Sequence, residues 1–306
     1  MLRTEGTRRE KPSLAWVGNS SEMSRTAPEH PVGRPACNLS EPLGELEMPT
    51  SNQAFDSHLE TWKREQAMPW QRVRRKVEIS NLLRHVGQSD LKILDAGGGN
   101  GYASIPFAQN GCQVVVADYS EAMLTDGQKL MSELGLDKSV SFVLTRLEDL
   151  SSVIHDQEFD VVLCHNVLEY VESIPVVLRS ILRPLKSQGI VSIICKNRYS
   201  IAYHQAFLRG DLQAAKAAIG ATETNTIFGC AARALAVDEI VKLLEDQGCV
   251  VQADYGLRCM MDYWGDNERK TEPNTLAQLE ELEFALSAEY PYKLLARFFQ
   301  VIAQKA

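Results

Sequence analysis

The sequence lacks long apolar runs, paired cysteines and an excess of positive charge, and each absence excludes a class of protein. No run of about 18 apolar residues occurs among the 306 residues, so neither a membrane span nor a membrane partner is expected. The opening MLRTEGTRREKPS is charged and has no apolar segment, which argues against a secretory signal. The seven cysteines include no C-x-x-C pair, which favours free thiols in a reducing cytoplasm over a disulfide framework or a zinc site. We therefore expect a cytoplasmic protein without a bound metal.

Positive charge and the common hydrolase motifs are also scarce. The formal net charge is −8, so a nucleic-acid partner would need a local basic patch to overcome a repulsive overall field. The chain has no H-E-x-x-H, G-x-S-x-G or P-loop pattern, which argues against a protease, an esterase and a nucleoside triphosphatase.

The first part of the chain divides into a polar leader and a helical segment. Residues 1–50 are rich in Pro, Ser, Glu and Arg and show no hydrophobic period, which predicts a disordered leader. Met48 offers a second start site, so the sequence leaves open whether residues 1–47 belong to the native protein. Residues 51–88 show a helical pattern, with Phe55, Leu59 and Trp62 on one face.

Strand and helix patterns alternate from residue 91 onward, which predicts an α/β fold with a doubly wound, mostly parallel sheet. Stretches such as VVVAD and DVVLC are apolar on both faces, as expected for strands covered by helices on both sides. Residues 198–232 interrupt the alternation with two short helices and a loop. Seven strands are predicted, at 91–96, 112–119, 140–145, 159–165, 189–197, 249–259 and 296–304.

The glycine-rich stretch DAGGGNG follows the first predicted strand. Its crowded glycines fit the G-x-G-x-x-G spacing of a dinucleotide site poorly, which disfavours an NAD-dependent oxidoreductase. Asp118 ends the second strand, where a carboxylate can accept hydrogen bonds from ribose hydroxyls. Asp95 precedes the glycines and could brace the turn or meet a ligand amine. The pattern therefore indicates a nucleoside site, and the alternative is a tight turn without a ligand.

Four motifs together resemble class I S-adenosylmethionine-dependent methyltransferases. They are the Asp95–Gly101 turn, the acid at Asp118, the Leu147-Glu148-Asp149 triplet after the third strand and Leu182-Arg-Pro184 after the fourth. The resemblance covers residues 90–200 and implies S-adenosyl-L-methionine as the cofactor. One departure is Leu185-Lys-Ser-Gln-Gly189, where the family has an immediate Pro-Gly-Gly; we expect a longer surface turn there.

A narrower resemblance extends from about residue 50 to the C-terminus. DAGGGNG, LCHNVLEYV, GLRCMMDYW and the closing PYKLLARFFQVIAQ look like the bacterial tRNA 5-carboxymethoxyuridine methyltransferase family. The chain lacks that family's lysine-rich stretch and L-S-P-x-x-P pattern, and Ala234-Leu-Ala-Val-Asp238 stands there instead. The resemblance implies one methyltransferase domain over 51–306, a Rossmann-like seven-stranded sheet with an N-terminal helical cap over 51–88, and a substrate-side insertion over 198–232.

The resemblance also implies a reaction and a set of site residues. The family methylates the carboxylate of a tRNA wobble uridine, and a carboxylate is already anionic at pH 7, so no catalytic base is expected. A guanidinium can hold that anion with a bidentate fork, and Arg258 is our candidate. The residues expected to contact the cofactor are Arg74, Asp95, Gly97, Gly98, Gly99, Asp118, Tyr119, Leu147, Glu148 and His165.

Several of these residues have simpler interpretations. Arg258 could be a surface arginine that pairs with Asp262 four residues later. His165 could be a packed histidine at a strand end, and Tyr119 and Met123 could be core residues rather than partners of an adenine.

The segment Trp62–Lys76 carries six basic residues and one acid, which suggests phosphate contacts with a tRNA. In that hypothesis Lys63, Arg64, Arg72, Arg75 and Lys76 bind phosphates while Trp62 and Trp70 stack on bases. The alternative is a solvated helix face. For the whole protein, the rivals are a small-molecule methyltransferase with 198–232 as a lid, and a non-catalytic binding protein with the same fold. The oligomeric state is open.

Overall fold

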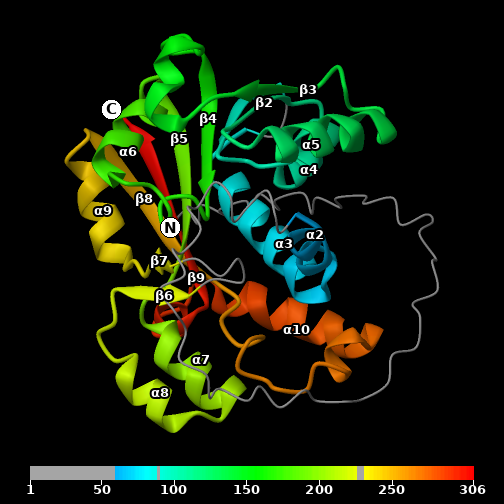
Figure 1. Cartoon of the computed structure of the whole chain (residues 1–306), viewed down its shortest axis with the longest axis vertical. Helices are drawn as coiled ribbons and strands as arrows, with labels where there is room; N and C mark the ends of the chain where they lie inside the picture. The colour runs from blue at the N-terminus through cyan, green and yellow to red at the C-terminus, as the bar shows by residue number, and fades with distance from the viewer. Residues whose placement is uncertain (1–58, 88–89, 226–230) are drawn as a thin grey trace, which may run out of the picture. The chain divides into compact units, whose positions relative to one another are not determined.

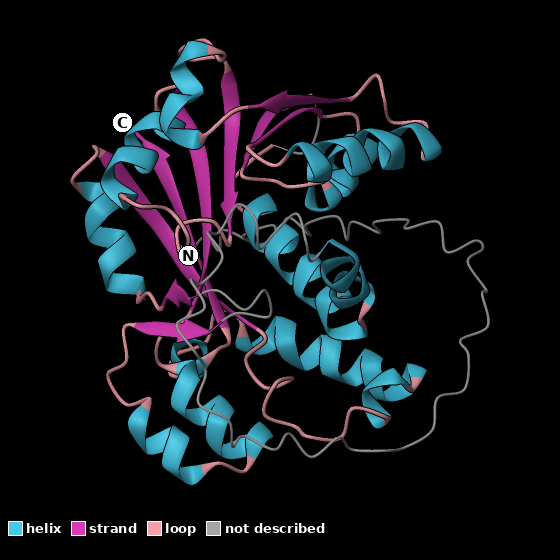
Figure 2. Cartoon of the chain, viewed as in Figure 1, coloured by secondary structure: helices cyan, strands magenta, loops and turns pink. Residues whose placement is uncertain are grey.

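The computed structural model of the chain describes residues 59–87, 90–225 and 231–306, and the predicted leader lies outside these ranges. A seven-stranded sheet forms the central layer, in the order β3-β2-β1-β4-β5-β9-β8 (Figure 2). Strands β1 to β5 are parallel, and β9 runs antiparallel to both of its neighbours. The predicted Rossmann-like, mostly parallel fold is confirmed. The strands are β1 Lys92–Ala96, β2 Gln113–Asp118, β3 Val140–Leu144, β4 Phe159–His165, β5 Leu185–Lys196, β8 Cys249–Leu257 and β9 Phe298–Lys305.

Helices cover both faces of the sheet, as the doubly apolar strands predict. One buried cluster joins the strands to η2, α6 and α9, and a second joins them to α3, α4 and α5. Figure 1 shows α6 and α9 on one side and α3, α4 and α5 on the other. The helices on these two faces are α3 Pro69–Leu83, α4 Ile105–Gln109, α5 Glu121–Glu133, η2 Leu147–Ser152, α6 Ile174–Leu182 and α9 Val237–Glu245.

The described part of the N-terminal segment forms two helices, α2 Leu59–Ala67 and α3. Val73 and Val77 of α3 are buried in a third cluster with Leu279 of α10, which spans Pro273–Leu286. Because α3 is held by the sheet on one side and α10 on another, its remaining face is fixed in position over the carboxyl edge of the sheet.

The segment between β5 and α9 contains the two short helices that its sequence predicts. They are α7 Ser200–Arg209 and α8 Leu212–Ala217. A two-stranded ribbon, β6 Glu223–Asn225 with β7 Ala231–Arg233, was not expected there. Three short helical turns complete the described elements: η1 Tyr102–Ser104, η3 Arg269–Thr271 and η4 Tyr292–Leu295.

The expectation of a surface turn at Leu185 was wrong. Leu185 is fully buried and pairs with Phe159 at the start of β5. After the glycine turn, the helical stretch divides into η1 and α4 because Pro106, at the start of α4, fits only a first helical turn. Ser120 caps α5, since its hydroxyl accepts a hydrogen bond from the Met123 N–H at 3.2 Å.

Candidate active site

A cavity of about 1300 Å³ opens at the carboxyl edge of the parallel strands. Ligands of open α/β sheets bind at this edge because the loops after the strands meet there. Helices α2 and α3 cover one side of the cavity and α7 and α8 another. All eleven residues predicted as site residues line it, namely Arg74, Asp95, Gly97, Gly98, Gly99, Asp118, Tyr119, Leu147, Glu148, His165 and Arg258.

The glycine turn packs too closely for side chains. Gly97 and Gly99 have φ angles of 73° and 57°, in the left-handed region that glycine adopts without strain. A Cβ on Gly98 would lie 2.4 Å from the Asp95 carboxyl carbon. That carboxyl also accepts a 2.6 Å hydrogen bond from the Ser104 hydroxyl. Of the two roles considered for Asp95, the structure therefore shows the bracing one. Burial raises the pKa of Asp95 to about 6.

Asp118 ties the end of β2 to the glycine turn. Its Oδ2 accepts a hydrogen bond from the Gly99 N–H and its Oδ1 one from the Ser120 N–H, both at 2.9 Å. The side chain is 8% exposed and faces the cavity. The two backbone contacts hold the carboxylate on the cavity wall, beside the glycine turn.

The loop after β3 supplies the next part of the wall. Leu147 begins η2 and is buried, whereas the Glu148 side chain is 27% exposed and forms a 3.7 Å ion pair with Arg146. Tyr119 lines the cavity beside them, and Met123 is both buried and part of the wall. The core interpretation of Met123 and the site interpretation are therefore compatible.

His165 ends β4 and is held in place by a hydrogen bond. Its Nε2 lies 2.9 Å from the Ser192 hydroxyl, and its buried Nδ1 has no hydrogen-bond partner among the described residues. Burial, with a smaller effect of the Arg74 charge, lowers the pKa of His165 to about 4. The imidazole is therefore neutral at pH 7. Both interpretations hold in part, since the ring is packed at the strand end and also lines the cavity.

Arg74 and Arg258 both line the cavity, and both guanidiniums lie near the Phe298 ring. The Arg74 Nε donates to the Glu78 carboxylate at 3.2 Å, and its guanidinium lies 4.6 Å from the centre of the Phe298 ring. The Arg258 Nε donates to Asp262 Oδ1 at 2.8 Å, and its Nη2 donates to the same oxygen. The alternative pairing of Arg258 with Asp262 is thus present. However, the pair is buried, with side chains 13% and 4% exposed, so Arg258 is not a surface arginine.

The basic segment Trp62–Lys76 does not present one continuous phosphate-binding face. Arg75 turns inward, where its guanidinium lies 4.5 Å from the centre of the Tyr102 ring. Lys63 pairs with Asp126 and Lys76 with Glu280, which reduces the charge available to a phosphate. Trp70 packs beside the third buried cluster, so it is poorly placed to stack on a base. Of the other residues expected in the patch, Trp62 lines the cavity, and Arg64 and Arg72 are exposed.

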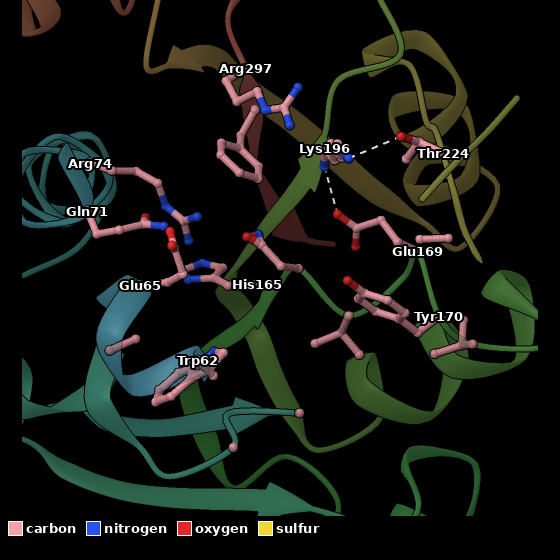
Figure 3. Close-up of a pocket in the computed structure, with 18 of the residues that line it drawn as sticks. Trp62, Glu65, Gln71, Arg74, His165, Glu169, Tyr170, Lys196, Thr224 and Arg297 are labelled. Carbon is pink, nitrogen blue, oxygen red and sulfur yellow. Dashed lines mark hydrogen bonds between the residues drawn. The ribbon is translucent and has the colours of Figure 1, made fainter. Parts of the chain in front are cut away.

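The ionisable residues of the cavity wall that were not singled out from the sequence include Glu169, Lys196 and Arg297, which are labelled in Figure 3. Burial raises the pKa of Glu169 to about 7, and burial together with the Arg297 charge lowers the pKa of Lys196 to about 8. The sequence did contain a signal for two of these residues. Glu169 lies within LCHNVLEYV, and Lys196 is an ionisable residue at the end of an apolar strand.

The described residues offer neither a metal site nor a membrane-spanning helix. Residues 59–87, 90–225 and 231–306 contain no group of three or more His, Cys, Asp or Glu side chains placed to hold a metal. No helix within these ranges is long and apolar enough to cross a membrane. Cys112, Cys164, Cys195, Cys249 and Cys259 are buried free thiols.

The sheet order, with a cavity above the glycine turn, defines a Rossmann-like methyltransferase fold. Residues 88–268 match the family model described as methyltransferase domain, and the chain therefore belongs to that family. It is 27% identical over 240 residues to the tRNA 5-carboxymethoxyuridine methyltransferase of Escherichia coli (strain K12), covering 78% of this chain and 87% of that one. A ubiquinone biosynthesis O-methyltransferase of Rickettsia conorii is 30% identical over 115 residues, 38% of each chain.

Solved structures support the fold. An S-adenosylmethionine-dependent methyltransferase from Mesorhizobium loti superposes with a TM-score of 0.52 at 17% identity, covering 75% of this chain and 98% of that one. The [4+2]-cyclase SpnF superposes with a TM-score of 0.59 at 16% identity, covering 84% and 96%. Since a cyclase shares the architecture, the acceptor and the reaction have to be argued from the site.

Proposed function

We propose that this methyltransferase-domain protein transfers the methyl group of S-adenosyl-L-methionine to a carboxylate. The favoured acceptor is 5-carboxymethoxyuridine at the tRNA wobble position, which becomes a methyl ester. The likeness to the Escherichia coli relative supports this acceptor because it extends over 78% of the chain. A tRNA acceptor also implies a cytoplasmic location.

The glycine-turn half of the cavity suits the cofactor. Asp118 would accept hydrogen bonds from the ribose hydroxyls, because its carboxylate ends β2 on the cavity wall beside the glycine turn. The Leu147 N–H and the Glu148 carboxylate would flank the adenine, with Tyr119 beside it. Arg74 would hold the methionyl carboxylate, because its guanidinium faces the cavity and only its Nε is bonded to Glu78. His165 would contact the cofactor as a neutral imidazole, and the Gly97–Gly99 backbone would allow its close approach.

One observation carries the choice of a carboxylate acceptor. Three largely buried cations, Lys196, Arg258 and Arg297, line the same cavity, and within the described residues the acids that pair with or lie close to them are Asp262 and Glu169. Glu169 is largely protonated below pH 7, because burial raises its pKa to about 7. This wall is therefore cationic and favours an anionic acceptor group.

The reaction needs alignment rather than proton transfer. A carboxylate oxygen attacks the methyl carbon in line with the sulfonium sulfur, and the C–S bonding pair remains on sulfur. The products are a neutral methyl ester and the demethylated cofactor, with no proton to remove. A partly dry cavity that fixes both reactants accelerates such a step.

An exposed aromatic pair offers a base-stacking surface that replaces the expected Trp62 and Trp70 patch. Tyr203 and Phe207 of α7 are 42% and 63% exposed. Their rings stack with centres 6.1 Å apart and planes 16° apart. His204 and Gln205 of the same helix line the cavity, so a nucleotide stacked on this pair would lie close to one bound inside.

A second candidate is methyl transfer to a hydroxyl of a small molecule, and Glu169 favours it. Its Oε2 is buried without a hydrogen-bond partner in the described ranges, and its pKa of about 7 suits a general base. The two candidates predict different pH profiles. A hydroxyl acceptor requires ionised Glu169, so kcat/KM should rise through pH 7 and should collapse in Glu169→Gln. A carboxylate acceptor predicts no such rise.

The decisive experiment is mass analysis of wobble nucleosides from a strain that lacks this gene. The tRNA hypothesis predicts that 5-carboxymethoxyuridine accumulates and its methyl ester disappears. Complementation with the wild-type gene should restore the ester, whereas Asp118→Asn should restore less. An unchanged ester level in the deletion strain would exclude this acceptor.

A further inference from the structure

Two arginines of the cationic wall differ in their hydrogen bonds. The Arg258 guanidinium donates to a neighbouring carboxylate, whereas the Arg297 guanidinium donates to no described residue. Both hydrogen bonds of the Arg258 guanidinium go to Asp262 Oδ1. Arg297 reaches the other oxygen of Asp262 only as a 3.6 Å ion pair. Across the described ranges, no group accepts a hydrogen bond from the Arg297 guanidinium, although the Arg297 side chain is only 16% exposed.

Arg297 lines the cavity, and none of its guanidinium nitrogens is both fully enclosed and unpartnered. A ligand in the cavity can therefore supply acceptors that the described residues do not. A planar carboxylate matches the arginine fork, since two parallel N–H groups can donate to its two oxygens. Arg297 therefore has the unused donors that a carboxylate acceptor needs.

Lys196 provides a second cation beside Arg297. It ends β5 and pairs in register with Phe298, the first residue of β9, so Arg297 immediately precedes the neighbouring strand. The Arg297 charge is close enough to lower the pKa of Lys196, after the larger effect of burial. Its ammonium donates one long hydrogen bond, 3.3 Å, to the Thr224 hydroxyl, and no acid lies within ion-pair distance in the described part of the chain. The dashed lines in Figure 3 join Lys196 to Thr224 and, through its backbone N–H, to Glu169.

We infer that Arg297 and Lys196 form the anion site that receives the acceptor carboxylate, and that Arg258 is a positioning residue that acts through Asp262. The inference rests on the proposed function and changes the assignment of the carboxylate-binding arginine. Arg258 and Asp262 then hold the backbone around Arg297, whose main-chain N–H donates to the Arg258 carbonyl at 3.1 Å.

The site also explains how the product would leave. Methylation turns the carboxylate into a neutral ester, which forms weaker hydrogen bonds with a guanidinium and an ammonium than an anion does. Arg297 and Lys196 therefore bind the substrate more tightly than the product. This difference in affinity is the property to measure, because a residue that only supports the fold would not produce it.

The experiment compares two forms of one tRNA, with 5-carboxymethoxyuridine or with its methyl ester at the wobble position. Affinities are measured with S-adenosylhomocysteine bound. The wild type should prefer the carboxylate form by roughly 10- to 100-fold, the range expected for charge-assisted hydrogen bonds. Arg297→Met should remove most of this preference by weakening only the carboxylate form. Lys196→Met should remove part of it, and Arg258→Lys should keep it.

Controls separate binding from folding. Affinity for S-adenosylhomocysteine should stay within about 2-fold of wild type in each variant, and Arg179→Met, at an exposed position of α6, serves as a matched surface control. If Arg297→Met does not fold, Lys196→Met alone decides the outcome by its effect on the preference.

The outcomes separate the inference from the proposed function. An enzyme that does not methylate the carboxylate tRNA refutes the function and the inference with it. An active wild type whose preference survives in Arg297→Met and Lys196→Met refutes the inference alone. Loss of the preference in Arg258→Lys instead assigns the carboxylate to Arg258.

Discussion

The replacement Asp118→Asn tests the proposed cofactor site directly. The amide is nearly isosteric but neutral, and only one of its two terminal atoms can accept hydrogen bonds. Two ribose hydroxyls would lose a charged acceptor, and a hydrogen bond to a charged group contributes about 1.5–3 kcal/mol. The amide oxygen recovers part of this, so we expect a loss of about 1–3 kcal/mol, or roughly 5- to 150-fold in the Kd for S-adenosylhomocysteine.

The same replacement should also destabilise the fold, because Asp118 accepts hydrogen bonds from the Gly99 and Ser120 N–H groups. One of these would face an NH2 donor, at a cost of about 1–3 kcal/mol in the free energy of unfolding. Isothermal calorimetry measures the affinity and urea unfolding the stability. Asp160→Asn is the matched control, since its carboxylate accepts the Lys92 N–H at 2.9 Å and lies outside the cavity wall. An Asp118→Asn affinity equal to that of this control would refute the ribose assignment.

Three further predictions concern the turn, the RNA surface and pH. Gly98→Ala places a methyl group 2.4 Å from the Asp95 carboxyl carbon, so S-adenosylhomocysteine binding should be lost and the Tm should fall in calorimetry. Phe207→Ala should raise the KM for tRNA by roughly 5- to 150-fold, from about 1–3 kcal/mol of stacking, with cofactor affinity unchanged in calorimetry. Lys196 is charged below its pKa of about 8, which burial and the Arg297 charge lower and Glu169 raises. Affinity for the carboxylate tRNA should therefore fall as pH rises through 8, and binding curves for Lys196→Met should lack this step.

Local features of the sequence predicted the cofactor half of the site. The turn after β1, the acid that ends β2 and the loop after β3 each follow a strand immediately, and parallel strands bring such loops to one edge. The residues named on that basis all line one cavity. The apolar strands and their spacing likewise predicted the seven-stranded sheet, because burial on both faces leaves a continuous apolar pattern.

The acceptor half was harder to predict because its residues come from distant segments. Arg258 and Asp262 were recognised as a pair from their spacing, but the sequence did not show that the pair is buried. The basic residues of α3 share a segment but not a direction, since Arg75 turns inward and Lys76 pairs with Glu280. Sequence spacing reports neither burial nor the partner of a long side chain.

The sequence by itself determined the strand pattern, the glycine turn, Asp118 and the methyltransferase class, because these depend on local backbone chemistry and on residues next to one another in the chain. Only the tertiary structure decided which cations face the acceptor. The antiparallel pairing of β9 with β5 brings Arg297, the residue before β9, close to Lys196. The packing around Asp262 engages the Arg258 guanidinium and leaves the Arg297 guanidinium without a hydrogen-bond acceptor in the described residues. Arg258 and Arg297 differ because their partners come from segments that are distant in the sequence. In a cavity with little water, one hydrogen bond decides whether a side chain is available to a ligand.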